Sequence, residues 1–352
     1  MTLLLIDSFD YFSAGTTPST AELSAFNYFN ISGSATCITG PFGGVAMASR
    51  GDGGGGAQPS TAFDLVHPNF SAGISAETII GQRIWAYGNS SGRFYVKNSS
   101  AGTIFSVGVN SYGQVVVYNY DNSIKAISRP GTVNTQTWNY FEIRFTLNTR
   151  IRVRVNTDLV IDYVGTFGPP SVPTTWDVLS WGGAMSFTTQ QVFAWDDLYV
   201  LTTTAAPNND YLGNVRVRLQ QPAAAGDVTQ LTPVGAASNY LAQINPTLSA
   251  GVYDQTATVG QYDLYQMQAN AAARNIYGVQ VRGTFLQDNA TQLKGSLVMK
   301  TGGTEYEGTH YSLSSAYDTY YSVWDINPHT SAAWTNSDLN AIQAGPKLAE
   351  SA

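Results

Sequence analysis

Cysteine and histidine are scarce in this sequence, with one cysteine and three histidines among 352 residues. A single cysteine excludes an intramolecular disulfide and a cysteine-rich zinc site. We expect Cys37 to be a small buried hydrophobic residue. The histidines His67, His310 and His329 are far apart in the sequence and lack the spacing of metal ligands. We therefore expect neither a zinc site nor any other cofactor.

Charged residues are also scarce. They make up 12% of the chain, and the net charge is −7, so the charged share is roughly half the usual one. The excess of acidic residues is shared by both halves of the chain, which disfavours nucleic-acid binding. The 21 tyrosines favour strands over long exposed helices. Uncharged surfaces rich in Tyr and Asn suit contact with a protein or a sugar.

Long hydrophobic runs are absent from the sequence. The first residues, MTLLLIDSFD, contain no Lys or Arg, and their apolar run is too short for a signal peptide. No other run has the length of a transmembrane span. We expect a protein that is made in a cytoplasm, binds no membrane and leaves the cell inside a particle released by lysis.

What the sequence does contain is alternating hydrophobic and polar residues, separated by clusters of Gly, Asn, Ser and Pro. This pattern predicts strands joined by hairpins and loops, and no segment has a sustained helical period. The expected strands are Arg93–Lys97, Thr103–Val109, Gln114–Tyr120, Trp138–Leu147, Ile151–Val155, Val192–Leu201, Asn214–Leu219, Tyr262–Met267, Ile276–Phe285, Leu293–Lys300 and Tyr317–Ile326.

The strands are expected to form two antiparallel β-sandwich or jelly-roll domains, so the fold class is all-β. Residues 1–202 would form the first domain. Residues 203–212 contain small residues and one Pro and are expected to be a linker. Residues 213–352 would form a smaller β-sandwich. The Gly-rich stretch 51–56 is expected to be a flexible loop.

Three features of the first domain resemble the concanavalin A-like (laminin G-like) jelly roll. DSFDYF at Asp7–Phe12 is expected to be the first strand. Trp138–Phe145 and the following Arg152–Gly165 are expected to form a core strand and a hairpin. WDDLYVL at Trp195–Leu201 is expected to return beside the first strand. The resemblance implies a fold only, because this fold hosts lectins, glycosidases, lyases and inert structural modules.

The end of the chain, Trp324–Lys347, reads WDINPHTSAAWTNSDLNAIQAGPK. Thr335 and Asp338 have the spacing of a capping box, and Gly345 is expected to stop the helix, which predicts one short C-terminal helix. The stretch is similar to the ending of many tailed-bacteriophage virion proteins, in which DP-x-T-G-x-AWT-x-x-x-LNA-x-Q-x-G closes an all-β domain. This resemblance implies a virion protein.

Candidate catalytic residues are few. Glycoside hydrolysis needs two carboxylates roughly 5–9.5 Å apart, and the close glutamate pair is Glu305 and Glu307. Asp196 and Asp197 are adjacent, so we expect them to point to opposite faces of their strand. Neither pair matches the E-x-D-x-E motif of fold-related glucanases, and the hydrolase, zinc-protease and P-loop motifs are missing. We expect no enzymatic activity, with a glycan depolymerase as a remote alternative.

Candidate binding residues are an arginine stripe and two tryptophans. Arg150, Arg152 and Arg154 alternate and so share one face of a strand. They suit an acidic partner surface or an anionic glycan, although a solvated face that prevents edge pairing is the more common role. Trp176 and Trp181 would stack on sugars if exposed, but aromatic residues in a sandwich more often belong to the core.

Calcium is the metal that lectins of the concanavalin A-like class often use, through Asp and Asn oxygens. Asp52, Asp121 and Asn122 lie in predicted loops. No ligand set can be assembled from these residues, so calcium stays an unsupported possibility.

The function that we expect is a structural component of a tailed-phage virion, such as a head decoration protein, head fibre, neck protein or tail appendage. Its partners would be phage capsid, neck or tail proteins, and family analogy favours a homo-oligomer, most often a trimer. The alternative is a carbohydrate-binding adhesin for a host surface glycan.

Overall fold

The structure, a computed structural model, describes residues 2–32, 35–50, 61–70, 72–86, 92–171, 173–183, 192–244, 251–269, 275–288 and 292–351. The stretch 51–56, with Asp52, lies outside these residues. The described chain is all-β, and its strands pair antiparallel in several sheets. It forms two compact units: a first unit of Thr2–Leu23 and Asn27–Val217, and a second of Ser24–Phe26 and Arg218–Ala352.

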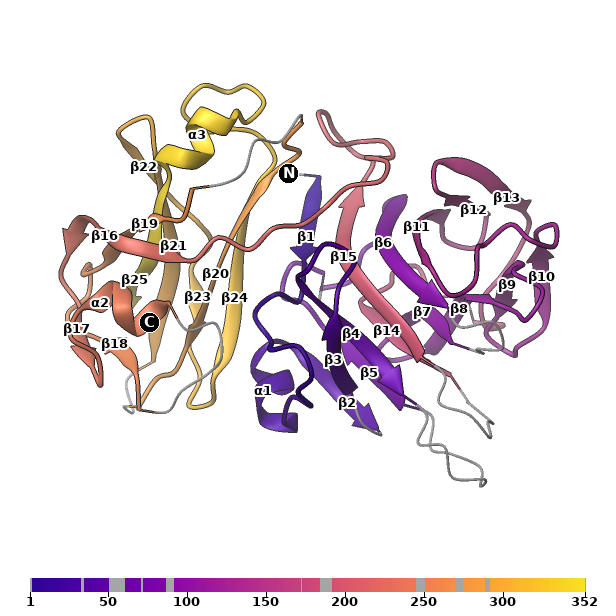
Figure 1. Ribbon diagram of the computed structural model, residues 1–352, viewed down its shortest axis with the longest axis horizontal. Helices are drawn as coiled ribbons and strands as arrows, with labels where there is room; N and C mark the ends of the chain where they lie inside the picture. Colours follow the sequence, from indigo (N-terminus) through magenta and orange to yellow (C-terminus); the bar gives the residue numbers. More distant parts are fainter. Residues whose placement is uncertain are drawn as a thin grey trace. The chain divides into compact units, whose positions relative to one another are not determined.

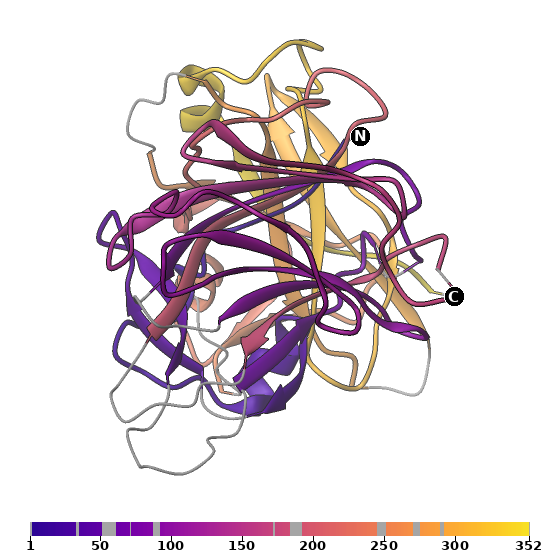
Figure 2. The same ribbon diagram turned by 90° about the vertical axis from the view of Figure 1, so that its right-hand side faces the viewer.

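The first unit contains an eight-stranded and a seven-stranded sheet (Figures 1 and 2). The eight-stranded sheet has the order β13-β12-β11-β6-β15-β4-β3, and β1 pairs with β15. Its strands are β1 (Leu3–Asp7), β3 (Ala35–Thr39), β4 (Val45–Arg50), β6 (Thr78–Ala86), β11 (Trp138–Thr146), β12 (Arg150–Val155), β13 (Asp158–Val164) and β15 (Val192–Thr202).

The seven-stranded sheet has the order β10-β9-β8-β7-β14-β5-β2. Its strands are β2 (Tyr28–Ser32), β5 (Thr61–Leu65), β7 (Arg93–Asn98), β8 (Gly102–Val109), β9 (Val115–Asn119), β10 (Ile124–Ile127) and β14 (Val178–Gly183). A short helix, α1 (Thr20–Ala25), precedes β2.

The core lies between the two sheets. Trp181 on β14 donates its indole N–H to Gln82 Oε1 on β6 (2.8 Å) and stacks on Trp195 of β15. These contacts pass from one sheet to the other, so the first unit is a sandwich. Cys37 is completely buried, as expected, and burial raises the pKa of its thiol to about 11.

Two of the strand relationships that carried the jelly-roll resemblance are confirmed. The closing strand β15 pairs with β1, and β11, β12 and β13 form a continuous meander. The expected first strand was misplaced, because β1 ends at Asp7. The Asp7 carboxylate accepts hydrogen bonds from Phe9 N and Tyr11 Oη (2.9 Å each), and Phe9 has a positive φ of 57°. These contacts turn the chain away from the strand.

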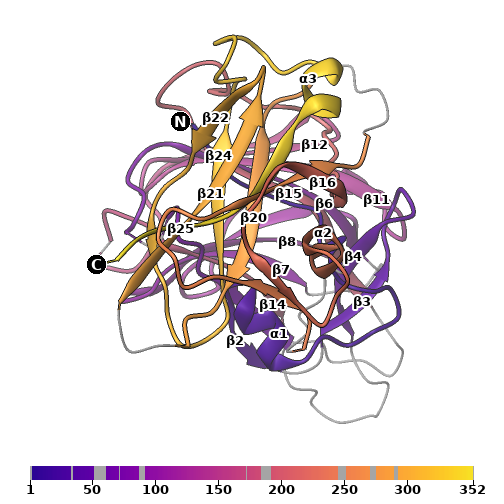
Figure 3. The same ribbon diagram turned by 90° about the vertical axis from the view of Figure 1, so that its left-hand side faces the viewer.

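The second unit is built on a six-stranded sheet of order β16-β19-β25-β21-β22, with β23 beside β21 (Figure 3). Two two-stranded sheets, β17-β18 and β20-β24, accompany it. The strands are β16 (Pro222–Thr229), β17 (Thr232–Val234), β18 (Tyr253–Gln255), β19 (Asp263–Met267), β20 (Val279–Phe285), β21 (Leu293–Thr301), β22 (Thr304–Glu307), β23 (Tyr311–Ser312), β24 (Asp318–Trp324) and β25 (Gln343–Ser351).

The expected C-terminal helix is α3 (Asn336–Ala341), and its capping box forms as predicted. The sequence missed two other short helices, α1 and α2 (Asn239–Gln243). The expected stop at Gly345 was wrong, because α3 is followed directly by β25, which contains Gly345. A Cβ at Gly345 would lie 2.2 Å from the Asp263 carbonyl oxygen, so the glycine permits close packing of β19 rather than helix termination.

Candidate functional site

The candidate site is the face of the eight-stranded sheet that points away from the core. On β11, Phe141, Ile143 and Phe145 are buried in the core, whereas Glu142 and Arg144 alternate with them and lie on the opposite face. Register places Arg154 opposite Glu142 and Arg152 opposite Arg144. We call this surface, formed by β6, β11, β12, β13 and β15, the outer face.

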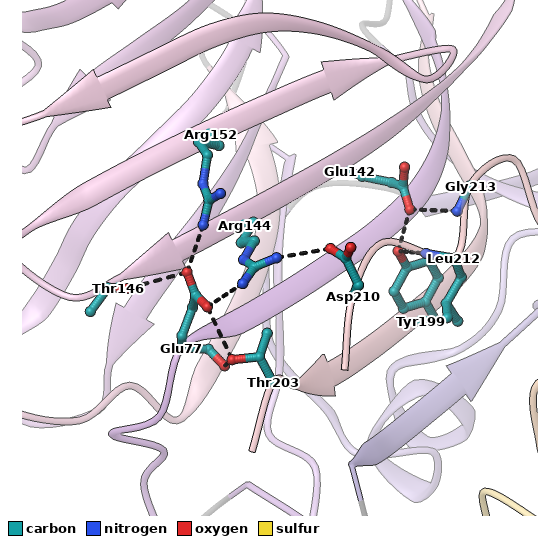
Figure 4. Close-up of polar contacts among 10 residues, drawn as sticks. All are labelled: Glu77, Glu142, Arg144, Thr146, Arg152, Tyr199, Thr203, Asp210, Leu212 and Gly213. Carbon is teal, nitrogen blue, oxygen red and sulfur yellow. Dashed lines mark hydrogen bonds and ion pairs between the residues drawn. The ribbon is translucent and has the colours of Figure 1, made fainter. Parts of the chain in front are cut away.

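Residues 203–217, here called the strap, are bound to the outer face (Figure 4). Asp210 pairs with Arg144 (2.8 Å), and Gly213 N donates to Glu142 Oε1 (2.8 Å). At the end of the strap, Val217 N donates to Asp197 Oδ1 (2.8 Å). The segment 203–212, expected to be a linker, is therefore held by the first unit.

Contacts between the strap and β6 explain why the expected strand Asn214–Leu219 does not form. Arg83 of β6 donates to Asn214 Oδ1 and to the Val215 carbonyl oxygen (2.7 and 3.1 Å). The Val215 carbonyl oxygen therefore bonds to a side chain and not to a neighbouring strand, so no strand ladder forms here. Exposure does alternate along Asn214–Leu219, as the sequence pattern NVRVRL predicts, but the segment is irregular and not a strand.

Glu77 is the centre of one polar cluster on the outer face (Figure 4). Its carboxylate accepts hydrogen bonds from Arg144 (2.6 Å), Arg152 (2.8 Å), Thr203 (3.0 Å) and Thr146 (3.4 Å). Burial opposes ionisation of Glu77, but hydrogen bonds from Arg144 and Thr203 and the charges of Arg144 and Arg152 outweigh it and lower the pKa of its carboxyl. Glu77 therefore stays ionised and joins β11, β12 and the start of the strap.

Glu142 is the centre of a second, more deeply buried cluster. It is 1% exposed and accepts a hydrogen bond from Tyr199 Oη (2.5 Å) as well as from Gly213 N. Burial raises the pKa of Tyr199 well above its usual value, so the phenol remains the donor. The sequence offered no signal for this cluster, because Tyr199 and Gly213 meet Glu142 only through sheet pairing and strap docking.

The three arginines of the predicted stripe do share the outer face, in an alternating burial pattern along β12. Arg150 forms a forked pair with Asp162 (2.8 and 2.6 Å), and Arg152 pairs with Glu77. The guanidinium of Arg154 stacks on the ring of Tyr211 in the strap, 3.8 Å from its centroid. The stripe is thus partly neutralised by its own neighbours.

The two tryptophans proposed as sugar platforms are both core residues. Trp176 and Trp181 are 0% exposed, so neither ring can stack on a ligand in this structure. The tryptophans that reach the outer face are Trp85 and Trp138, which lie opposite each other on β6 and β11 with ring centroids 5.7 Å apart. The signal for Trp138 was its even spacing from Glu142 and Arg144 along β11, which places all three on one face.

The carboxylate pair considered for hydrolysis is engaged in contacts within the second unit. Glu305 accepts a hydrogen bond from Tyr262 Oη (2.9 Å). Glu307 pairs with Lys347 (2.5 Å) and His310 (2.9 Å) and accepts a hydrogen bond from Ser296 (2.6 Å). Both glutamates are therefore held by neighbouring side chains.

Asp196 and Asp197 were expected to point to opposite faces of a regular strand, but the strand is not regular at this position. A bulge interrupts β15 between Asp196 and Tyr199, and Asp197 has a positive φ of 51°. Both aspartates are buried, and Asp197 forms an ion pair with Arg83 (2.9 Å). The bulge turns both side chains toward buried partners.

Metal-ligand groupings are absent from the part of the chain that the structure describes, where no three His, Cys, Asp or Glu residues are placed to hold a metal ion. Asp121 accepts hydrogen bonds from Ser123, and Asn122 accepts one from Arg93. None of the helices among the described residues has the length and apolar character needed to cross a membrane.

No family model matches the chain, and no curated protein matches it. Solved structures similar to it include the cellulose-induced protein Cip1 (14% identity over 56% of this chain and 96% of that one, TM-score 0.39). Another is a carbohydrate esterase from Shiga toxin-encoding bacteriophage phi24B (15%, 57% and 98%, TM-score 0.39). A third is the binding domain of botulinum neurotoxin serotype D/C (10%, 95% and 98%, TM-score 0.39). At TM-scores this low, these similarities support no conclusion about this chain.

Proposed function

We propose that this protein is a non-enzymatic structural component of a tailed-phage virion that acts by protein–protein binding and display. The observation that carries the proposal is the state of its carboxylates. Glu77, Glu142 and Glu307 each accept hydrogen bonds from two or more neighbouring groups, an arrangement that fixes local structure. A hydrolase instead needs two carboxylates free to face a substrate.

The C-terminal stretch supports the viral part of the proposal through the role it plays in the second unit. Trp334 of AAWT is buried with Leu339 and Ile342 and donates its indole N–H to the Trp324 carbonyl oxygen (3.0 Å). The residues that resemble the phage ending therefore close a hydrophobic core. In the phage proteins that it resembles, the same stretch closes an all-β domain.

Mass spectrometry on gradient-purified particles tests the proposal, with copy number scored against the major capsid protein. We expect the chain to co-purify with particles at a fixed ratio. Hundreds of copies would indicate head decoration, and roughly a dozen or fewer a neck or tail position. Recovery only in the soluble fraction would overturn the virion assignment.

The alternative, a carbohydrate-binding adhesin, is favoured by one observation. Trp85 and Trp138 are only partly buried on the outer face, where an aromatic pair could contact a sugar ring. In this case host surface polysaccharide should retain the purified protein on a column. Passage through the column without delay would remove the alternative.

A further inference from the structure

Arg154 differs from the other arginines of the outer face in what balances its charge. Arg150 pairs with Asp162, and Arg152 and Arg144 both pair with Glu77. Over the described ranges, no carboxylate lies within ion-pair distance of Arg154, which is half-buried and stacked on Tyr211. A positive charge is thus held in place by an aromatic ring, and Glu142, the carboxylate opposite it on β11, accepts its hydrogen bonds from Tyr199 and Gly213 instead.

Hydrogen-bond donors without acceptors surround the same ring. The Nε atoms of Arg144, Arg152 and Arg154 and the Oη atom of Tyr211 are buried, and none of the described groups accepts from them. Arg144 Cζ lies 5.7 Å and Arg154 Cζ 3.8 Å from the centre of the Tyr211 ring. Each unsatisfied buried donor destabilises the folded state. Because the protein covers these atoms, a partner would be attracted by the positive charge of the guanidinium groups, which favours a partner with negative charge.

Exposed aliphatic side chains border this cluster. Leu159 and Val164 of β13 are 54% and 70% exposed, and they lie opposite Arg154 and Arg150 in the register of β12 and β13. Arg and Tyr are enriched in protein interfaces, and the exposed aliphatic groups beside them add apolar area that a protein partner can bury. A polysaccharide would satisfy the arginines but would leave Leu159 and Val164 in water.

We propose that this surface, the Arg154 surface (Arg150, Arg152, Arg154, Leu159, Val164 and Tyr211), binds an acidic polypeptide segment that also carries aliphatic side chains. Its carboxylates contact the guanidinium groups of Arg154 and Arg152, and its aliphatic groups cover Leu159 and Val164. The inference rests on the proposed binding function and specifies the chemistry of the partner.

The test measures binding of a labelled glutamate–leucine copolymer to the purified full chain by fluorescence anisotropy. We expect Arg154→Gln to weaken binding about tenfold, which corresponds to about 1.4 kcal/mol. Tyr211→Phe, which removes only the hydroxyl, should weaken it less, and Leu159→Ser should weaken binding of the copolymer more than binding of polyglutamate. Circular dichroism melting checks that each variant is folded.

The matched control is Arg93→Gln, because Arg93 also stacks on a tyrosine, Tyr118, with its Cζ 3.6 Å from the ring centroid, but on β7 of the other sheet. Equal losses in Arg93→Gln and Arg154→Gln would reveal non-specific attraction and overturn the proposal. So would a lack of copolymer binding, or tighter binding of alginate, a polyuronate that lacks aliphatic side chains. If the protein is an oligomer and Arg154→Gln dissociates it, the Arg154 surface binds a second copy of this chain, and the proposal of an acidic partner is overturned. Because this assay needs no particles, its failure leaves the virion assignment standing.

Discussion

At the scale of single residues, buried polar contacts connect neighbouring side chains of the first unit. Asp196 and Asp197 are 5% and 2% exposed, and Asp197 N donates to Asp196 Oδ1 (2.7 Å). Arg83 balances the charge of Asp197. Burial, together with the negative charge of Asp197, holds the pKa of Asp196 well above the usual carboxyl range. Protonation of Asp196 is therefore linked to folding.

The first prediction at this scale concerns pH. Because the folded state keeps a proton on Asp196 that the unfolded chain releases above about pH 4, the free energy of unfolding should fall as pH rises from there toward neutral. The limiting slope for one proton is about 1.4 kcal/mol per pH unit. Asp196→Asn should remove this slope, matching the natural protein at acid pH and exceeding its stability at neutral pH.

Urea unfolding of the first unit, followed by tryptophan fluorescence at several pH values, measures this effect. The control is Asp158→Asn, which changes an exposed carboxyl at the start of β13 and should leave the curve parallel to that of the natural protein. An Asp196→Asn variant that is less stable at neutral pH would show that the ionised carboxylate is required.

At the scale of elements, α3 illustrates how much a short motif can specify. Thr335 Oγ1 accepts from Asp338 N (3.2 Å), and the Asp338 carboxylate accepts from Thr335 N (2.9 Å). These reciprocal bonds satisfy helix N–H groups that otherwise have no partner. Leu339 and Ile342 then lie in the core of the second unit beside Trp334. The cap thus sets the start of α3 and positions its apolar residues.

We expect Thr335→Ala to lower the free energy of unfolding of the second unit by about 1 kcal/mol, the usual cost of losing a side-chain cap. Thermal unfolding by calorimetry measures the change. The matched control is Thr330→Ala, at an exposed turn position shortly before the helix, which should have little effect. Equal melting temperatures for Thr335→Ala and the natural protein would show that packing of Trp334 and Leu339 alone fixes α3.

At the scale of the whole molecule, the strap extends the first unit beyond its last strand. Strand β15 ends at Thr202, but the first unit continues to Val217. Contacts of Glu142, Arg144 and Asp197 with the strap account for these additional residues. The strap is therefore part of the fold of the first unit.

Two shortened chains should consequently differ in stability. A chain ending at Val217 should fold, whereas one ending at Thr202 should be less stable by roughly 3 kcal/mol or more, because buried Glu142 and Asp197 lose hydrogen-bond donors. Thermal melting of both chains measures the difference. Equal melting temperatures would mean that water replaces the strap at no cost.

The amino-acid sequence alone determined the all-β class, the core meander after Trp138, the closing strand at Trp195–Leu201 and the capped helix after Thr335. These features depend on alternation, turn residues and caps, which act between residues close in the chain. The shared face of Arg150, Arg152 and Arg154 follows from the same alternation.

Only the tertiary structure decided which face of each strand is covered and which segment covers it. Trp176 and Trp181 are buried because their rings face β6 of the eight-stranded sheet, whereas Trp138 lies on the outer face. The irregular conformation of 214–217 depends on Arg83 of β6, and Glu142 and Arg154 find their partners in strap residues far away in sequence. Periodicity identifies faces, but burial and hydrogen-bond partners across a sheet are set by segments that meet only when the chain folds.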